Sequence, residues 1–127
     1  MDTITRHEND DWFTFEPYEQ ATGNSDEQQM RSQTAIDPTH TYNVWSVLTL
    51  PDGNYIVRGW NYWPSDYPES CYWQGTTINY QNAVSPVLAH EAGHYFGLYH
   101  TFQDDCSSLN DYVEDTPAMH SDGTYNC

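Results

Sequence analysis

Runs of apolar and β-branched residues mark three candidate strands in the middle of the chain. Residues 41–50 (TYNVWSVLTL) predict the best strand, because β-branched and aromatic side chains favour extended backbone. Residues 55–60 (YIVRGW) predict a second strand, which follows a turn at residues 51–54 (PDGN). Residues 74–80 (QGTTINY) predict a third, short and polar as an edge strand lining a cleft would be. The pattern thus predicts three strands.

Two weaker elements precede these strands. The apolar cluster at residues 12–15 (WFTF) predicts a short strand or a docking segment. Residues 21–33 (ATGNSDEQQMRSQ) read as a polar turn that runs into a short helix. Ser25 and Asp26 are both candidate N-caps for it, because either side chain can accept a hydrogen bond from the first-turn N–H groups.

A second helix is predicted after the strands. Ser85 is its candidate N-cap, and Pro86 occupies the first helical position, where its missing N–H costs nothing. We expect this helix over about residues 84–99. Residues 101–127 are acidic and rich in Ser, Asn, Gly and Pro without an apolar period, and predict a long loop.

The predicted helix carries the motif H-E-x-x-H-x-x-G-x-x-H, whose fixed positions are His90, Glu91, His94, Gly97 and His100. Residues four apart share a helix face, so His90 and His94 can present two imidazoles to one ion. Gly97 allows a left-handed turn that returns His100 as a third ligand. Three protein ligands leave a position for water, which is typical of catalytic zinc, and Glu91 can reach that water.

Composition narrows the choice of partners. The 127 residues suffice for one domain, and their 19 acidic residues against three arginines give a formal charge of −16. Such a chain repels nucleic acid and anionic membranes, so we expect neither as a partner. The charge favours cation binding, although a solvated acidic surface explains it equally well. No apolar run approaches the roughly 20 residues that span a bilayer, and residues 1–13 lack the features of a signal peptide.

The residues around the motif resemble one known family. Residues 101–103 (TFQ) and Cys106 follow the last histidine, and residues 111–117 (DYVEDTP) are similar to a D-x-V-x-D-T-P segment. Upstream, residues 42–47 (YNVWSV) resemble an L-N-V/I-Y/W strand, and residues 59–64 (GWNYWP) an L-G-Y-A-x-F-P segment. Together these segments resemble the pappalysin (cytophagalysin-like) family of metzincin zinc metallopeptidases.

The resemblance implies an α+β fold, with a twisted mixed sheet, an antiparallel edge strand, an active-site helix and a calcium-type loop. It implies a secreted zinc endopeptidase that hydrolyses peptide bonds through a zinc-bound water activated by Glu91. The partner would be a protein or peptide substrate, bound in extended form along the edge strand. Thr76, Thr77 and Ile78 of the third predicted strand are then the expected substrate contacts. The sequence carries no signal of oligomeric state.

The resemblance also implies calcium in the loop after the zinc helix. The side chains of Asp111, Asp115 and Thr116 and backbone carbonyls around Val113 offer the oxygen ligands that Ca²⁺ prefers. The alternative is an acidic loop that is solvated and binds no ion.

Departures from the family pattern lead us to expect a partial catalytic domain over residues 1–127. Family domains begin with a strand-helix-strand portion that has no counterpart here, and they continue beyond Cys127 into most of a C-terminal subdomain with a Met-turn. Met119 lacks the M-D-Y context of that turn, so we do not assign it. In the family, cysteines resembling Cys106 and Cys127 pair with downstream partners; here they pair with each other or stay free, and Cys71 has no counterpart.

These departures leave two alternatives to a working protease. One is a non-catalytic module in which zinc and calcium stabilise the fold. The other is an inactive fragment of such a protease. The intact Glu91 argues against a purely structural site, whereas the absent Met-turn argues for one.

Overall fold

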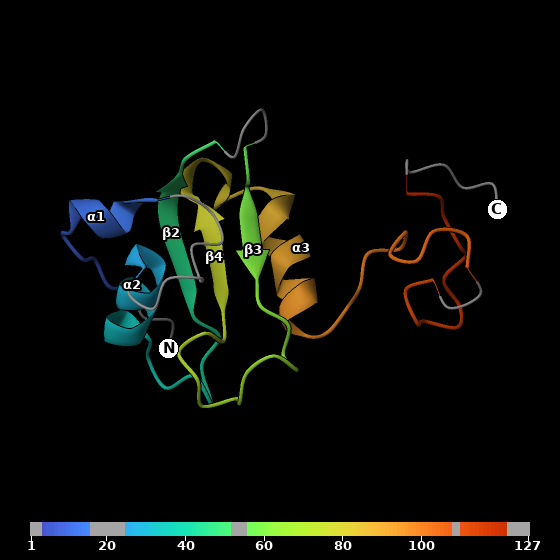
Figure 1. The fold of residues 1–127 in the computed structure, drawn as a ribbon, viewed down its shortest axis with the longest axis horizontal. Helices are drawn as coiled ribbons and strands as arrows, with labels where there is room; N and C mark the ends of the chain where they lie inside the picture. The colour runs from blue at the N-terminus through green and yellow to red at the C-terminus, as the bar shows by residue number, and fades with distance from the viewer. Residues whose placement is uncertain (1–3, 16–24, 52–55, 108–109, 122–127) are drawn as a thin grey trace. The chain divides into compact units, whose positions relative to one another are not determined.

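The computed structural model describes residues 4–15, 25–51, 56–107 and 110–121. The chain forms two compact units, Met1–Tyr95 and Phe96–Cys127. Figure 1 shows the elements of the first unit. In chain order they are α1 (Asp10–Phe13), β1 (Thr14–Phe15), α2 (Asp26–Thr34), β2 (Val44–Thr49), β3 (Gly59–Asn61), β4 (Thr76–Asn79), the 3₁₀ helix η2 (Tyr80–Asn82) and α3 (Pro86–Tyr95).

The sheet is mixed, with the strand order β1-β2-β4-β3. β1 pairs with β2 and β2 pairs with β4 in parallel, whereas β3 pairs with β4 antiparallel. A mixed sheet with an antiparallel edge strand was predicted, and the small mixed α/β architecture fits a partial metallopeptidase domain. The edge strand is β3, however, and not the strand at residues 74–80.

The prediction that residues 74–80 form the edge strand is therefore wrong. β4 lies between β2 and β3, and Thr76, Thr77 and Ile78 are all 0% exposed. Their assignment as substrate contacts is corrected accordingly, because both edges of their strand are already paired. The polar threonines indicated an exposed strand, but both hydroxyls form hydrogen bonds in the interior.

One face of the sheet packs against α2 and carries the hydrophobic core. Its buried members come from α2, β2, β3 and the loop before β4: Met30, Trp45, Val47, Trp60, Tyr62 and Trp73. Every second residue of β2 is buried, which is the period expected of a strand with one face on a core. The indole Nε1 of Trp45 donates to Thr34 Oγ1 at 2.8 Å and so ties β2 to the end of α2.

A buried ion pair lies within this core. Arg31 Nε is 2.8 Å from Glu27 Oε1, one helical turn apart on α2, and both side chains are 0% exposed. Trp60 Nε1 and the Tyr62 hydroxyl donate to the Glu27 carboxylate, at 2.9 and 2.8 Å. Arg31 Nη2 donates to Thr77 Oγ1 at 2.7 Å. With its charges paired and hydrogen-bonded, the ion pair fastens α2 to β3 and β4.

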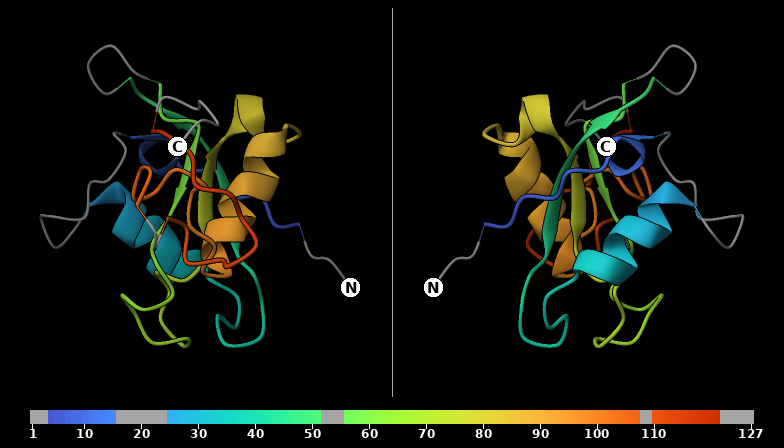
Figure 2. Two further views of the ribbon diagram at one scale, coloured as in Figure 1. Left: turned by 90° about the vertical axis from the view of Figure 1, so that its right-hand side faces the viewer. Right: turned by 90° about the vertical axis from the view of Figure 1, so that its left-hand side faces the viewer.

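α3 covers the opposite face, so the sheet lies between α2 and α3 (Figure 2). The helix is shorter than the predicted residues 84–99, because it begins at Pro86 and ends at Tyr95. Ser85 Oγ accepts a hydrogen bond from Val87 N at 3.3 Å, as expected of the N-cap. Gly97 has φ +84°, the left-handed conformation predicted for the turn after the helix.

The other sequence predictions are confirmed in part. Ser25 is the N-cap of α2, because its Oγ accepts from Gln28 N at 3.2 Å. The cluster at residues 12–15 divides between the end of α1 and the two-residue strand β1. The second predicted strand starts only at Gly59. The turn predicted at residues 51–54 lies mostly outside the described residues.

In the second unit, residues 101–107 and 110–121 form turns and irregular backbone, as predicted for a loop, and residues 96–100 are also outside any helix. Asp105, Asn110 and Tyr112 have positive φ angles of 52°, 39° and 62°, so the backbone turns repeatedly. None of the helices in the described parts of the chain combines the length and apolar character needed to cross a membrane.

Candidate metal and catalytic site

His90 and His94 lie on one face of α3, as their spacing predicted. Their Nε2 atoms are 3.0 Å apart, and the rings meet edge to face with centroids 4.5 Å apart. Two imidazole ligands of one tetrahedral zinc, each at its usual bond length, have nitrogens about 3.3 Å apart. The pair therefore fits a shared metal ion with little rearrangement.

Trp63, just after β3, packs edge-on against the His94 ring at a centroid distance of 5.4 Å. This contact limits rotation of the imidazole. Such a restraint favours metal binding, because the orientation of the ligand is then set before the ion arrives. The sequence predicted His94 but not Trp63, although the W-P pair at residues 63–64 was part of the family-like segment. No pattern in the sequence connects a loop tryptophan to a helix face 31 positions further on.

His100, the third predicted ligand, belongs to the second unit. Within that unit its ring stacks on Phe102, with centroids 4.8 Å apart and planes 6° from parallel. The left-handed Gly97 provides the turn that the motif requires before His100. Its role as a ligand stays a prediction.

Glu91 is the only described residue of α3 that is buried, with 6% of its surface exposed. It faces β3, where Asn61 Nδ2 donates to its carboxylate Oε2 at 3.3 Å and to its backbone carbonyl. Burial raises the pKa of the Glu91 carboxyl, while the charge of His94 and the hydrogen bond from Asn61 lower it. A carboxylate in this setting can accept a proton, as a general base must.

Gly59 provides the space that Glu91 occupies. A Cβ at this position would lie 3.0 Å from Glu91 Cγ and 3.3 Å from Oε1. Gly59 and Asn61 are two residues apart on β3 and therefore point to the same face of the sheet. The sequence analysis placed both in the family-like segment at residues 59–64 but assigned neither to the site.

The candidate calcium residues lie in the second unit. Asp111 is buried and its Oδ1 accepts from Val113 N at 3.1 Å, while Thr116 N donates to the Val113 carbonyl at 3.1 Å. Asp115 is exposed. Asn110, which the sequence did not single out, is 5% exposed, and its Oδ1 has no hydrogen-bond partner among the described residues. A buried oxygen without a donor is a suitable ligand for a hard cation.

The structure describes two of the three cysteines, Cys71 and Cys106. Cys71 is free and half-buried beside the core. Cys127 lies outside the described residues, so the pairing of Cys106 stays a prediction.

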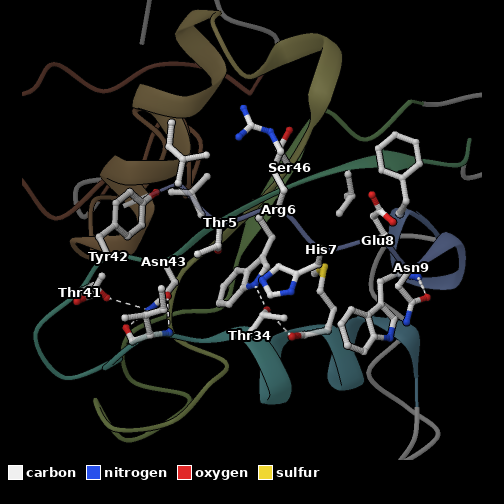
Figure 3. Close-up of a pocket in the computed structure, with 18 of the residues that line it drawn as sticks. Thr5, Arg6, His7, Glu8, Asn9, Thr34, Thr41, Tyr42, Asn43 and Ser46 are labelled. Carbon is white, nitrogen blue, oxygen red and sulfur yellow. Dashed lines mark hydrogen bonds between the residues drawn. The ribbon is translucent and has the colours of Figure 1, made fainter. Parts of the chain in front are cut away.

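A pocket of about 1290 Å³ lies elsewhere in the first unit, between residues 4–9 and the side chains of α2 and β2 (Figure 3). Leu88 is the α3 residue in its lining, whereas His90, Glu91 and His94 do not line it. Tyr42 does, and its hydroxyl is within hydrogen-bonding distance of Thr76 Oγ1. The pocket is thus separate from the histidine pair. One of its lining residues, Tyr42, is nevertheless connected to Glu91 by hydrogen bonds through Thr76 and Asn61.

Comparisons with known proteins identify a peptidase family. The family model described as pregnancy-associated plasma protein-A, a peptidase family, matches residues 24–127. Three fungal relatives are each named as extracellular metalloproteases. They come from Neurospora crassa (53% identical over 47 residues), Sordaria macrospora (39% over 93 residues) and Pyricularia oryzae (34% over 89 residues).

These matches cover 37%, 64% and 62% of the chain, and 16%, 32% and 30% of the three relatives. The chain therefore spans about a third or less of the length of the curated relatives it matches. No solved structure matches it at a significant level.

Proposed function

The chain belongs to the pregnancy-associated plasma protein-A, or pappalysin, family of metallopeptidases, and we propose that it forms the zinc-binding part of an extracellular metalloendopeptidase. The observation that carries this proposal is the convergence of His90 and His94 beside the buried Glu91. The extracellular location is inferred from the names of the fungal relatives.

His90, His94 and His100 would hold the zinc ion. The distance between the first two ring nitrogens supports this assignment, as does the left-handed Gly97 that precedes the third histidine. When bound, zinc supplies Lewis acidity towards water and the substrate carbonyl.

Glu91 acts as the general base and then as the general acid. Its carboxylate accepts a proton from the attacking water and passes it to the leaving amine when the peptide bond breaks. Burial suits this role, because desolvation makes a carboxylate a stronger base than it is in water. The contacts with Gly59 and Asn61 hold the group on the β3 side of the helix.

The substrate would bind along β3 rather than along β4. β3 ends the sheet among the described residues, and it is the strand that contacts Glu91 through Gly59 and Asn61. An extended peptide that pairs with its outer edge would add one strand to the sheet, with backbone hydrogen bonds giving affinity.

Calcium would bind in the loop of the second unit, through Asp111, Asp115, Thr116 and the carbonyl of Val113. The unpartnered oxygen of the neighbouring Asn110 supports this assignment, because a cation would supply the partner that this buried atom lacks.

A Glu91→Ala variant tests the proposed reaction. The purified full chain, loaded with zinc, is assayed with unfolded protein substrates, and zinc content is measured by mass spectrometry. We expect stoichiometric zinc in both proteins, chelator-sensitive cleavage by the wild type and a loss of about 100-fold or more in the variant. A Glu69→Ala variant, altered at an exposed carboxylate, serves as the control.

The outcomes separate the alternatives. Full activity in Glu91→Ala would contradict the role of the base. Zinc binding without cleavage by the wild type would favour the non-catalytic metal-binding module, and a chain that binds no zinc would favour the inactive fragment.

A further inference from the structure

Asn61 faces Thr76 across the antiparallel pair of β3 and β4, on the side of the sheet that α3 covers. The Thr76 hydroxyl donates to Asn61 Oδ1 at 2.5 Å. On its other side, the Asn61 amide nitrogen donates to Glu91, both to the backbone carbonyl and to Oε2. The side chain therefore connects the interior of the sheet to the general base on α3.

The direction of each hydrogen bond in this connection is determined by the chemistry of its members. Because Thr76 uses its single proton towards Asn61, the hydrogen bond between Tyr42 and Thr76 must be donated by the Tyr42 hydroxyl. Burial raises the pKa of the Tyr42 phenol, so this group keeps its proton at neutral pH. The side-chain amide of Asn61 can then form both of its hydrogen bonds in one orientation only, with its oxygen towards Thr76 and its nitrogen towards Glu91.

Glu91 is held against β3 as a result. Asn61 donates to both the backbone carbonyl and the carboxylate of this residue, and the missing Cβ of Gly59 leaves the space that its side chain occupies, because a Cβ there would lie 3.0 Å from Glu91 Cγ and 3.3 Å from Oε1. A carboxylate restrained in this way keeps its position relative to the imidazoles on the same helix.

We propose that Asn61 is a positioning residue for Glu91, oriented by the hydrogen-bonded chain from Tyr42 through Thr76. This inference deepens the proposed function and rests on it for its catalytic consequence. An aspartate at position 61 would fill the same volume but would have no N–H groups to donate, and its charge would repel the Glu91 carboxylate.

The contact itself is tested on the metal-free full chain. Hydrogen exchange of the Asn61 side-chain amide is followed by nuclear magnetic resonance, with Asn61→Asp used to assign its signals. We expect exchange about tenfold slower than at the exposed amide of Gln33. This protection should fall in Tyr42→Phe and Thr76→Val and persist in Thr76→Ser. Exchange as fast as at Gln33 in the wild type would overturn the inference.

The catalytic consequence is tested on the zinc-loaded chain with Asn61→Asp. We expect kcat to fall about 10- to 100-fold, with KM and zinc content unchanged. Gln33→Glu makes the same change of charge at an exposed position of α2 and should leave kcat unaltered. A purely structural role would instead lower the melting temperature while the folded protein kept its kcat, and this result would overturn the assignment.

Failure of the proposed function is distinguishable from failure of this inference. A wild-type chain that binds zinc and cleaves nothing would contradict the proposed function. The exchange measurement on the metal-free protein would still decide by itself whether Asn61 holds Glu91.

Discussion

Gly59 on β3 and Glu91 on α3 approach each other so closely that a Cβ at position 59 would be in tight contact with the glutamate side chain. A Cβ there would lie 3.0 Å from Glu91 Cγ and 3.3 Å from the Thr77 carbonyl oxygen. The strand that carries Gly59 is the antiparallel edge of the sheet. The position of Glu91, the candidate general base, therefore depends partly on the missing Cβ of Gly59.

We expect Gly59→Ala to lower the free energy of unfolding by about 1–3 kcal/mol, the usual cost of overpacking a buried site. Urea denaturation measures this change. The same substitution in a Glu91→Ala background should cost less, because the side chain that it meets is gone. Equal costs in the two backgrounds would show that the strain arises at the Thr77 carbonyl instead.

Gly75→Ala should be more damaging than Gly97→Ala. Both glycines have positive φ angles, +127° and +84°. At Gly75 a Cβ would lie 2.4 Å from the Asn43 carbonyl oxygen, whereas no described atom lies within 4 Å of one at Gly97. We expect about 1–2 kcal/mol for the backbone conformation alone at Gly97 and several kcal/mol at Gly75, where backbone strain and overpacking add. Thermal unfolding of both variants checks the order.

Glu27→Gln should destabilise the first unit strongly. The substitution leaves Arg31 buried without its counter-charge, and the amide has one acceptor oxygen where the carboxylate uses two, one accepting from Trp60 and the other from Tyr62. Breaking a buried pair in this way costs about 3–5 kcal/mol. Urea denaturation of Glu27→Gln is compared with Glu69→Gln, at an exposed position, where we expect a change within about 0.5 kcal/mol. Similar curves for the two variants would contradict the importance of the ion pair.

His94→Ala should abolish stoichiometric zinc binding, whereas His40→Ala should leave it unchanged. The Nε2 atoms of His94 and His90 are 3.0 Å apart, so both can bind one ion, whereas His40 is exposed and pairs with Asp37. We expect a loss of affinity greater than the roughly 10- to 100-fold that follows removal of an outer-shell partner. Competition with a chromogenic chelator measures both affinities.

Calcium should raise the melting temperature of the wild type, because a ligand that binds only the folded state stabilises it by mass action. Asp111→Asn and Asn110→Ala should each reduce this shift, since one weakens and the other removes a buried oxygen ligand. Asp10→Asn, at an exposed position in the first turn of α1, is the control. An identical shift in all four proteins would place the ion elsewhere, and no shift in the wild type would contradict the site.

The sequence predicted the parts of the site that local geometry determines. The spacing of His90 and His94 follows from the helical repeat, and Gly97 takes the conformation that its position after the helix requires. The caps Ser25 and Ser85 are local in the same sense.

The hydrogen-bond partners of the buried glutamates could not be predicted, because they come from distant parts of the sequence. Asn61 is 30 positions away from Glu91, and Thr77 is 50 positions away from Glu27. No periodicity in the sequence encodes such pairs. The same limitation explains the error over β4, because threonines look exposed until their distant hydrogen-bond partners are known.

β4 carries threonines at two successive positions, 76 and 77. Thr76 donates a hydrogen bond to Asn61, which in turn donates to Glu91, whereas Thr77 accepts a hydrogen bond from Arg31. A slip of one residue in either direction would leave a threonine at only one of these two positions and would place Ile78 or Gly75 at the other, so one of the two hydrogen bonds would be lost. The residues on either side of the two threonines restrict the alignment further. Gly75 fits under the Asn43 carbonyl where no other residue would, and Ile78 has no polar group to exchange for either threonine. The alignment of β4, and with it the position of Thr76 beside Asn61, therefore depends also on two residues that have no polar side chain.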